Sequence, residues 1–161
     1  MGREIEHRFL VRHRALPRRL PAGDRIVQGF LSFEPVVRVR LRRPLKGGAT
    51  RAWLTIKGGG LRVRAEYEYG IPLADARRML KLCGDAVIEK VRICHGPWEI
   101  DRFLGRHRGL WVAELEMPNE RARLPDPLPE WIGREVTEDP RYTNSNLARA
   151  RKWPPSRGFL E

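Results

Sequence analysis

Charged side chains recur at every second position in several segments of this chain, a pattern that could bind a polyanion and metal ions. The charged positions are Glu4, Glu6 and Arg8; Arg38 and Arg40; Lys57; Arg64, Glu66 and Glu68; Lys90 and Arg92; Glu99 and Asp101; and Glu114 and Glu116. Successive side chains of a strand point to opposite faces, so each set lies on one face of its strand. The intervening residues are mostly apolar, which predicts a sheet with one apolar face and one face of acidic and basic rows.

The basic members of these sets could hold phosphate groups. A triphosphate carries several negative charges that repel an attacking water, and cations fixed around the phosphates relieve this repulsion. Arginine can bind phosphate oxygens in pairs, whereas lysine acts as a point charge. The candidate phosphate-binding residues are Arg8, Arg38, Arg40, Lys57, Arg64, Lys90 and Arg92, and the candidates for a direct catalytic role are Arg8, Lys57 and Lys90.

The acidic members would oppose a polyanion unless they hold metal. Mg²⁺ and Mn²⁺ prefer oxygen ligands and commonly bind between carboxylates and substrate phosphates, so we expect one or two such ions. The candidate metal ligands are Glu4, Glu6, Asp101, Glu114 and Glu116. Glu66 and Glu68 could contact metal or water, or could pair internally with Arg64 or Lys57.

Alternation of this kind usually indicates a half-exposed antiparallel sheet with its charges in water. Thr and Ser are scarce on the charged face and several strands carry one sign only, which favours a sheet curled around a charged lumen. Buried charges are costly unless they pair or bind ions and a charged ligand. Eight strands, enough to close an antiparallel barrel, are expected near 3–11, 26–33, 36–43, 51–57, 62–70, 87–94, 97–104 and 109–117.

Two helices are expected, packed outside the barrel as an α+β arrangement. The apolar period from Leu73 to Cys83 is helical, and Gly84 can end that helix. A second helix is expected to begin at Asn144 or Ser145, with one of these as its cap, and to end before Pro154.

The same segments resemble the CYTH family, the triphosphate tunnel metalloenzymes. The opening Glu4-Ile5-Glu6-His7-Arg8 is similar to the family's acidic N-terminal signature. The similarity continues in order through Gln28–Leu31, Val37–Arg40, Leu54–Gly58, Arg64–Tyr69, Lys90–Arg92, Trp98–Asp101, Ala113–Glu116, Trp131–Thr137 and Arg141–Ala148. It covers nearly the whole chain, so residues 1–161 are expected to form a single tunnel domain. The resemblance also allows the C-terminal helix to plug or line one end of the tunnel.

The resemblance implies a metal-dependent triphosphatase, most like the short bacterial inorganic tripolyphosphatases, in which the carboxylates above are the metal ligands. The substrate is left open by the family, which also contains adenylyl cyclases, thiamine triphosphatases and nucleoside triphosphatases. The family signature usually ends in lysine where this chain has Arg8. Arginine can hold phosphate but does not readily exchange a proton, so a non-catalytic polyphosphate- or nucleotide-binding protein is a further alternative.

Composition bounds the remaining function classes. The net charge of +12 invites nucleic-acid binding, but the acidic pairs beside the basic positions disfavour it. No stretch approaches the roughly 20 apolar residues of a membrane span, so a soluble, cytoplasmic protein is expected. Cys83 and Cys94 lack metal-ligand spacing and are expected to be packing thiols. The sequence leaves a homodimer open.

Overall fold

The computed structural model describes residues 2–150. The strands are β1 (Gly2–Val11), β2 (Asp24–Phe33), β3 (Val36–Pro44), β4 (Arg51–Lys57), β5 (Val63–Gly70), β6 (Val87–His95), β7 (Trp98–Phe103), β8 (Trp111–Glu116) and β9 (Ile132–Glu135). The helices are α1 (Leu73–Leu82) and α2 (Asn144–Arg149), with short 3-10 helices η1 (His13–Ala15), η2 (Gly105–His107) and η3 (Pro140–Tyr142).

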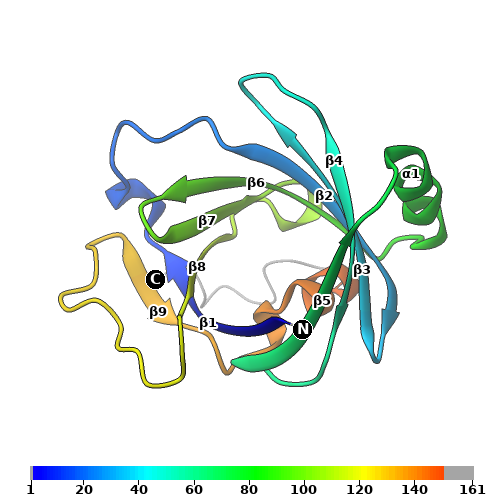
Figure 1. Ribbon diagram of the computed structural model, residues 1–161. Helices are drawn as coiled ribbons and strands as arrows, with labels where there is room; N and C mark the ends of the chain where they lie inside the picture. The colour runs from blue at the N-terminus through cyan, green and yellow to red at the C-terminus, as the bar shows by residue number, and fades with distance from the viewer. Residues whose placement is uncertain (1, 151–161) are drawn as a thin grey trace.

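Eight strands close into an antiparallel barrel, as the sequence predicts. The strand order is β5-β4-β3-β2-β6-β7-β8-β1, and β1 pairs back onto β5 through Gly2–Ile5. Most connections are short hairpins, which suit consecutive antiparallel strands. The β4–β5 turn needs Gly60, with φ +117°, because a Cβ there would lie 2.2 Å from the carbonyl oxygen of Val63. Figure 1 shows the strands curled into a barrel, and the charged side chains of the sheet point into it.

A ninth strand, β9, was not among the predicted elements. One edge of β1 pairs with β8. The other edge pairs with β5 along the first half of β1 and with β9 along the second half. The backbone N–H of Val136 then donates to the carbonyl oxygen of Arg8 over 2.7 Å. Residues 131–137 therefore strap the C-terminal half of β1.

Helix α1 packs on the outer face of β2, β3 and β4, as predicted (Figure 1). Its buried contacts join Val39, Ala52 and Ala76. Gly29 permits the close approach, because a Cβ at this position would lie 2.7 Å from the sulfur of Cys83. Cys83 is a buried packing thiol, as expected, but the expectation for Cys94 is wrong, since that residue is exposed near the end of β6.

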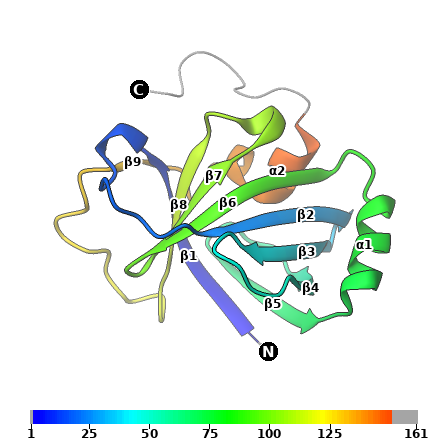
Figure 2. The same cartoon turned by 90° about the horizontal axis from the view of Figure 1, so that it is seen from above.

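Helix α2 has a different place from α1: it closes one end of the barrel. Its Leu147 and Ala148 pack with side chains on the inward face of the strands, among them Phe30, Ile88 and Phe103. Figure 2 shows α2 beside β6 and away from α1. Apolar residues at the end of the lumen face, which the charge pattern did not reveal, contact α2. The helix is therefore not packed outside the barrel but lies at one end of it, the place that the family resemblance allows.

The cap of α2 also differs from the prediction. The side chain of Thr143, and not that of Asn144 or Ser145, accepts from the backbone N–H of Asn146, and Asn144 is the first helical residue. The helix ends at Arg149; the predicted limit at Pro154 lies outside the described residues. None of the helices within residues 2–150 is both long and apolar enough to cross a membrane.

Candidate active site

The register of the barrel sets acidic residues opposite basic ones on its inner face. Arg8 lies opposite Glu114, Glu4 opposite Arg64, Lys57 opposite Glu66 and Arg92 opposite Asp101. Directly opposed residues share a face and have close Cβ atoms. The charged sets that the sequence places on separate strands are therefore brought together by the fold.

These side chains enclose a cavity of about 250 Å³. It is lined by Glu4, Glu6, Arg38, Arg40, Arg42, Lys57, Arg64, Glu66, Glu68, Arg92, Glu99, Glu114, Glu116 and Asn144. Within the described part of the chain the lining thus holds six cationic and seven carboxylate side chains. The wall is nearly neutral overall, so it would hold a polyanion well only with additional positive charge.

Three predicted site residues, Arg8, Lys90 and Asp101, lie deeper and do not line the cavity. All three are at most 1 % exposed. Lys90 Nζ lies 2.5 Å from Asp101 Oδ2 and donates to Asn144 Oδ1 over 3.2 Å. Burial lowers the pKa of Lys90 to about 8, although Asp101 opposes the shift. Asn144, at the start of α2, thereby connects the closing helix to this buried lysine.

Arg8 is held between two carboxylates. Its Nη2 donates to Glu6, and its Nε lies 3.5 Å from Glu114 Oε1. Among the described residues, Nε and Nη1 of Arg8 have no hydrogen-bond acceptor although both are buried. Buried donors are normally satisfied, so these two N–H groups are open to a further acceptor.

The acidic positions at the N-terminus of the chain differ in charge state. Burial opposes ionisation of Glu4, but Lys57 at 2.8 Å and Arg64 at 2.7 Å outweigh it and lower its pKa to about 2. For Glu6, burial and the nearby charge of Glu114 outweigh Arg8 and Arg64 and raise the pKa to about 7. The cationic neighbours of Glu6 therefore do not fully compensate for its burial and for the nearby charge of Glu114.

Glu66 takes the internal pairing with Lys57 that the sequence left open, whereas Glu68 has other partners than the expected Arg64 or Lys57. Glu66 lies 2.9 Å from Lys57, and Glu68 accepts from Thr55 Oγ1 over 2.9 Å and lies 3.5 Å from Arg38. Thr55, which is fully buried, also accepts from Arg38 Nη2 over 3.1 Å. Arg38 thus has both a hydroxyl and a carboxylate partner.

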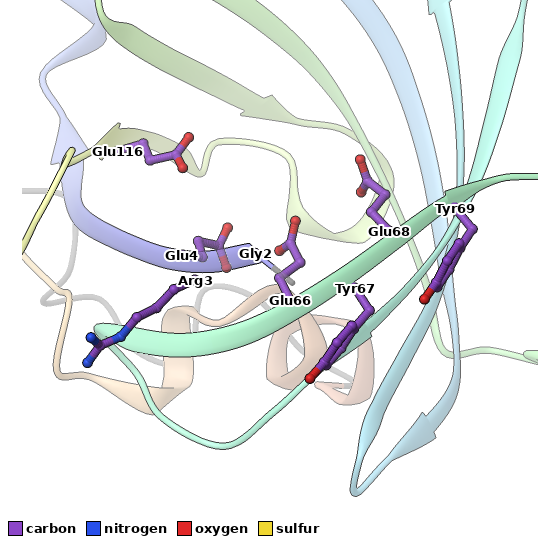
Figure 3. Close-up of a pocket in the computed structure, with 8 residues that line it drawn as sticks. All are labelled: Gly2, Arg3, Glu4, Glu66, Tyr67, Glu68, Tyr69 and Glu116. Atoms are coloured by element: carbon purple, nitrogen blue, oxygen red, sulfur yellow. The ribbon is translucent and has the colours of Figure 1, made fainter.

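A second, wider cleft of about 370 Å³ opens beside the cavity where β1 begins. Figure 3 shows Glu4, Glu66, Glu68 and Glu116 on the inner side of this opening, with Tyr67 and Tyr69 on the other face of β5. Burial, followed by the charges of Glu4 and Glu99, raises the pKa of Glu116. Arg3 also lines this cleft but pairs with Glu120. The inner side of the opening is therefore acidic.

The predicted metal ligands do not form a ready-made site. In residues 2–150, no three carboxylate, imidazole or thiol groups lie close enough together to hold a metal ion as they stand. Glu4, Glu6, Asp101 and Glu114 are instead paired with lysine or arginine. Their chemistry nevertheless fits a hard divalent ion, because the crowding of Glu6 by Glu114 and Glu4 is relieved by added positive charge.

Sequence reasoning missed several residues of the cavity. Arg42 continues the alternation of Arg38 and Arg40, so extending the period would have found it. Glu99 belongs to the alternating set with Asp101 but was not among the candidate site residues. Gln28, Thr55 and Asn144 carry no charge, and nothing in the charge pattern marks them.

The chain is similar in sequence and in structure to inorganic triphosphatases. No family model matches the chain. An inorganic triphosphatase of Acetivibrio thermocellus is 43 % identical over 155 residues, which are 92 % of this chain and 95 % of the relative. An inorganic triphosphatase of Nitrosomonas europaea is 33 % identical over 154 residues, covering 90 % of this chain and 96 % of that protein. The crystal structure of the inorganic triphosphatase NE1496 covers 94 % of this chain and 98 % of its own, with 29 % identity and a TM-score of 0.64.

Proposed function

This chain belongs with the inorganic triphosphatases of the CYTH type, and we propose that it hydrolyses inorganic tripolyphosphate to pyrophosphate and orthophosphate. In this reaction a water oxygen bonds to a terminal phosphorus while the bond from that phosphorus to the bridging oxygen breaks. Pyrophosphate leaves with the bridging oxygen, and the water releases a proton.

The observation that carries this proposal is Arg40, a partly buried cation that lines the cavity without a carboxylate partner. Within residues 2–150, no carboxylate forms an ion pair with Arg40, whereas Arg38, Arg64 and Arg92 each have at least one. Burial, and then the charges of Arg38 and Arg92, lower the pKa of Arg40 to about 9. Removal of this electrostatic cost by an anion favours phosphate binding.

The composition of the wall supports phosphate groups as the recognised part of the substrate. The cavity is lined by charged side chains and Asn144, and its far end is closed by apolar contacts of α2. Arg38, Arg40, Arg64 and Arg92 can supply guanidinium donors to phosphate oxygens, and Lys57 can supply an ammonium. Arg8 and Lys90 lie behind these cavity-lining residues. Arg8 orients the carboxylates of Glu6 and Glu114, and Lys90 orients that of Asp101.

We propose Mg²⁺ or Mn²⁺ as the cofactor, held by carboxylates among Glu4, Glu6, Glu114 and Glu116. A divalent ion would add the positive charge that the nearly neutral wall lacks and would polarise the phosphates or the attacking water. Binding requires these carboxylates to exchange part of their pairing with arginine and lysine. Asp101 is less suited to the role, because cations occupy both of its oxygens.

The test is phosphate release by the purified protein from tripolyphosphate, ATP and thiamine triphosphate, each with Mg²⁺, with Mn²⁺ and with chelator. The proposal predicts metal-dependent release that favours tripolyphosphate. Faster release from ATP or thiamine triphosphate would show that tripolyphosphate is not the preferred substrate. Tight triphosphate binding without release would replace hydrolysis by a binding function.

A further inference from the structure

Two neighbouring arginines on β3 are oriented through different chemistry. Arg42 Nε donates to the carboxylate of Asp24, so its charge is compensated within the protein. Arg40 Nε donates over 3.0 Å to Oε1 of Gln28, a neutral amide. Both partners belong to β2, so one strand offers an acid to one arginine and an amide to the next.

Gln28 is buried as completely as a side chain can be, with no exposed surface. It lies directly opposite Arg40 in the β2–β3 register and is therefore on the inner face. A guanidinium has donors only, so the amide oxygen must face Arg40 and the amide nitrogen must point elsewhere. Among the described residues, Nε2 of Gln28 has no acceptor.

An amide acceptor has a specific consequence for Arg40. It fixes the guanidinium through Nε, the donor nearest the backbone, and leaves both Nη groups to other acceptors. Because the amide is neutral, this hydrogen bond does not compensate the charge of Arg40. A carboxylate would orient the side chain equally well but would cancel the charge on which phosphate binding depends.

We propose that Gln28 is a positioning residue for triphosphate binding, which orients Arg40 toward the phosphates through a neutral acceptor and so preserves its charge. This inference rests on the proposed function and adds to it a residue outside the charged pattern. It gives a reason why a fully buried, uncharged side chain lies directly opposite Arg40 on the inner face of the barrel.

The test compares Gln28→Glu with Gln28→Leu in steady-state tripolyphosphate hydrolysis. Gln28→Glu keeps the acceptor and cancels the charge, so KM should rise about tenfold to a hundredfold while kcat changes less than about threefold. Gln28→Leu removes the acceptor but leaves the charge, so KM should rise by a smaller factor, about threefold to tenfold. Asn119→Asp is the matched control, because it makes the same amide-to-acid change at an exposed position and should leave both constants unchanged.

Combination with Arg40→Ala separates a positioning role from a general structural one. If Gln28 acts through Arg40, Gln28→Glu should raise KM no further once the guanidinium is gone. An equal rise in the Arg40→Ala background would overturn the proposal, as would an unchanged KM for Gln28→Glu alone. If Gln28→Glu does not fold, the same cycle with Gln28→Leu decides the question.

Equilibrium binding distinguishes failure of this inference from failure of the proposed function. Tripolyphosphate affinity is measured by titration calorimetry for the wild type and Gln28→Glu. If the wild type binds tripolyphosphate but releases no phosphate, the hydrolase proposal fails, and weaker binding by Gln28→Glu still supports Gln28. If the wild type does not bind tripolyphosphate, both proposals are overturned.

Discussion

Arg92 grips Asp101 through two parallel hydrogen bonds, from Nε to Oδ1 and from Nη2 to Oδ2, each 2.7 Å long. Lys90 also contacts Oδ2, so both oxygens of this fully buried carboxylate are occupied. Burial opposes ionisation, but Arg92 and Lys90 outweigh it and lower the pKa of Asp101. The residue predicted as a metal ligand is therefore, in this geometry, the anchor of two phosphate-site cations.

Asp101→Asn should destabilise the protein by about 3–5 kcal/mol, because it leaves Lys90 and Arg92 without their buried counter-charge. Urea unfolding measures the loss. Asp85→Asn, a change at an exposed position, is the control and should lie within about 0.5 kcal/mol of wild type. If Asp101→Asn changed the free energy of unfolding little but abolished the metal dependence of the reaction, Asp101 would instead be a metal ligand.

Arg40→Ala should raise the KM for tripolyphosphate by about tenfold to a hundredfold, since it removes a charge-assisted contact worth about 1.5–3 kcal/mol. Arg43→Ala, an exposed arginine on the same strand, is the matched control and should change little. Equal effects of the two variants would mean that the chain's general positive charge, and not the cavity, attracts the substrate.

Arg8→Lys should keep kcat within about tenfold of wild type, because Arg8 is proposed to act as a fixed charge and a guanidinium is not deprotonated in proteins. The variant should gain an alkaline limb in its pH–rate profile where the new lysine loses its proton. Arg102→Lys, an exposed change on β7, controls for the substitution itself. A rise in kcat of more than about a hundredfold would show that the family's lysine transfers a proton.

Acid should lower the stability of the fold through the buried His107. This buried ring contacts the carbonyl oxygen of Leu147 over 2.7 Å, and burial lowers its pKa below 6.5. The native state then binds fewer protons than the unfolded chain, so this contribution to stability is present above pH 6.5 and is lost as pH falls through the lowered pKa. Urea midpoints from about pH 7 to about pH 5 should fall less for His107→Gln than for wild type. The exposed control His13→Gln should follow wild type, and parallel slopes for all three would contradict the assignment.

The charge alternation predicted the eight barrel strands well because one side of each strand is apolar and the other is charged. It could not predict β9, which is short and lacks such a pattern, nor the seat of α2, which depends on apolar residues at one end of the lumen face. Strand register decides which charges meet, and pairs such as Arg8 and Glu114 are distant in sequence. Neutral residues such as Gln28 and Thr55 become visible as site residues only once their partners are known.

Acidic and basic residues of one cavity are proposed to do different parts of one reaction. Phosphate release from tripolyphosphate is measured across a Mg²⁺ titration for wild type, Arg40→Ala and Glu114→Gln, with Glu89→Gln, a partly exposed residue outside the cavity lining, as the control. Glu114→Gln should need much more Mg²⁺ for its half-maximal rate. Arg40→Ala should change the KM for tripolyphosphate with little change in metal requirement, and Glu89→Gln should resemble wild type. Unchanged turnover and affinity in both cavity variants would contradict this proposal.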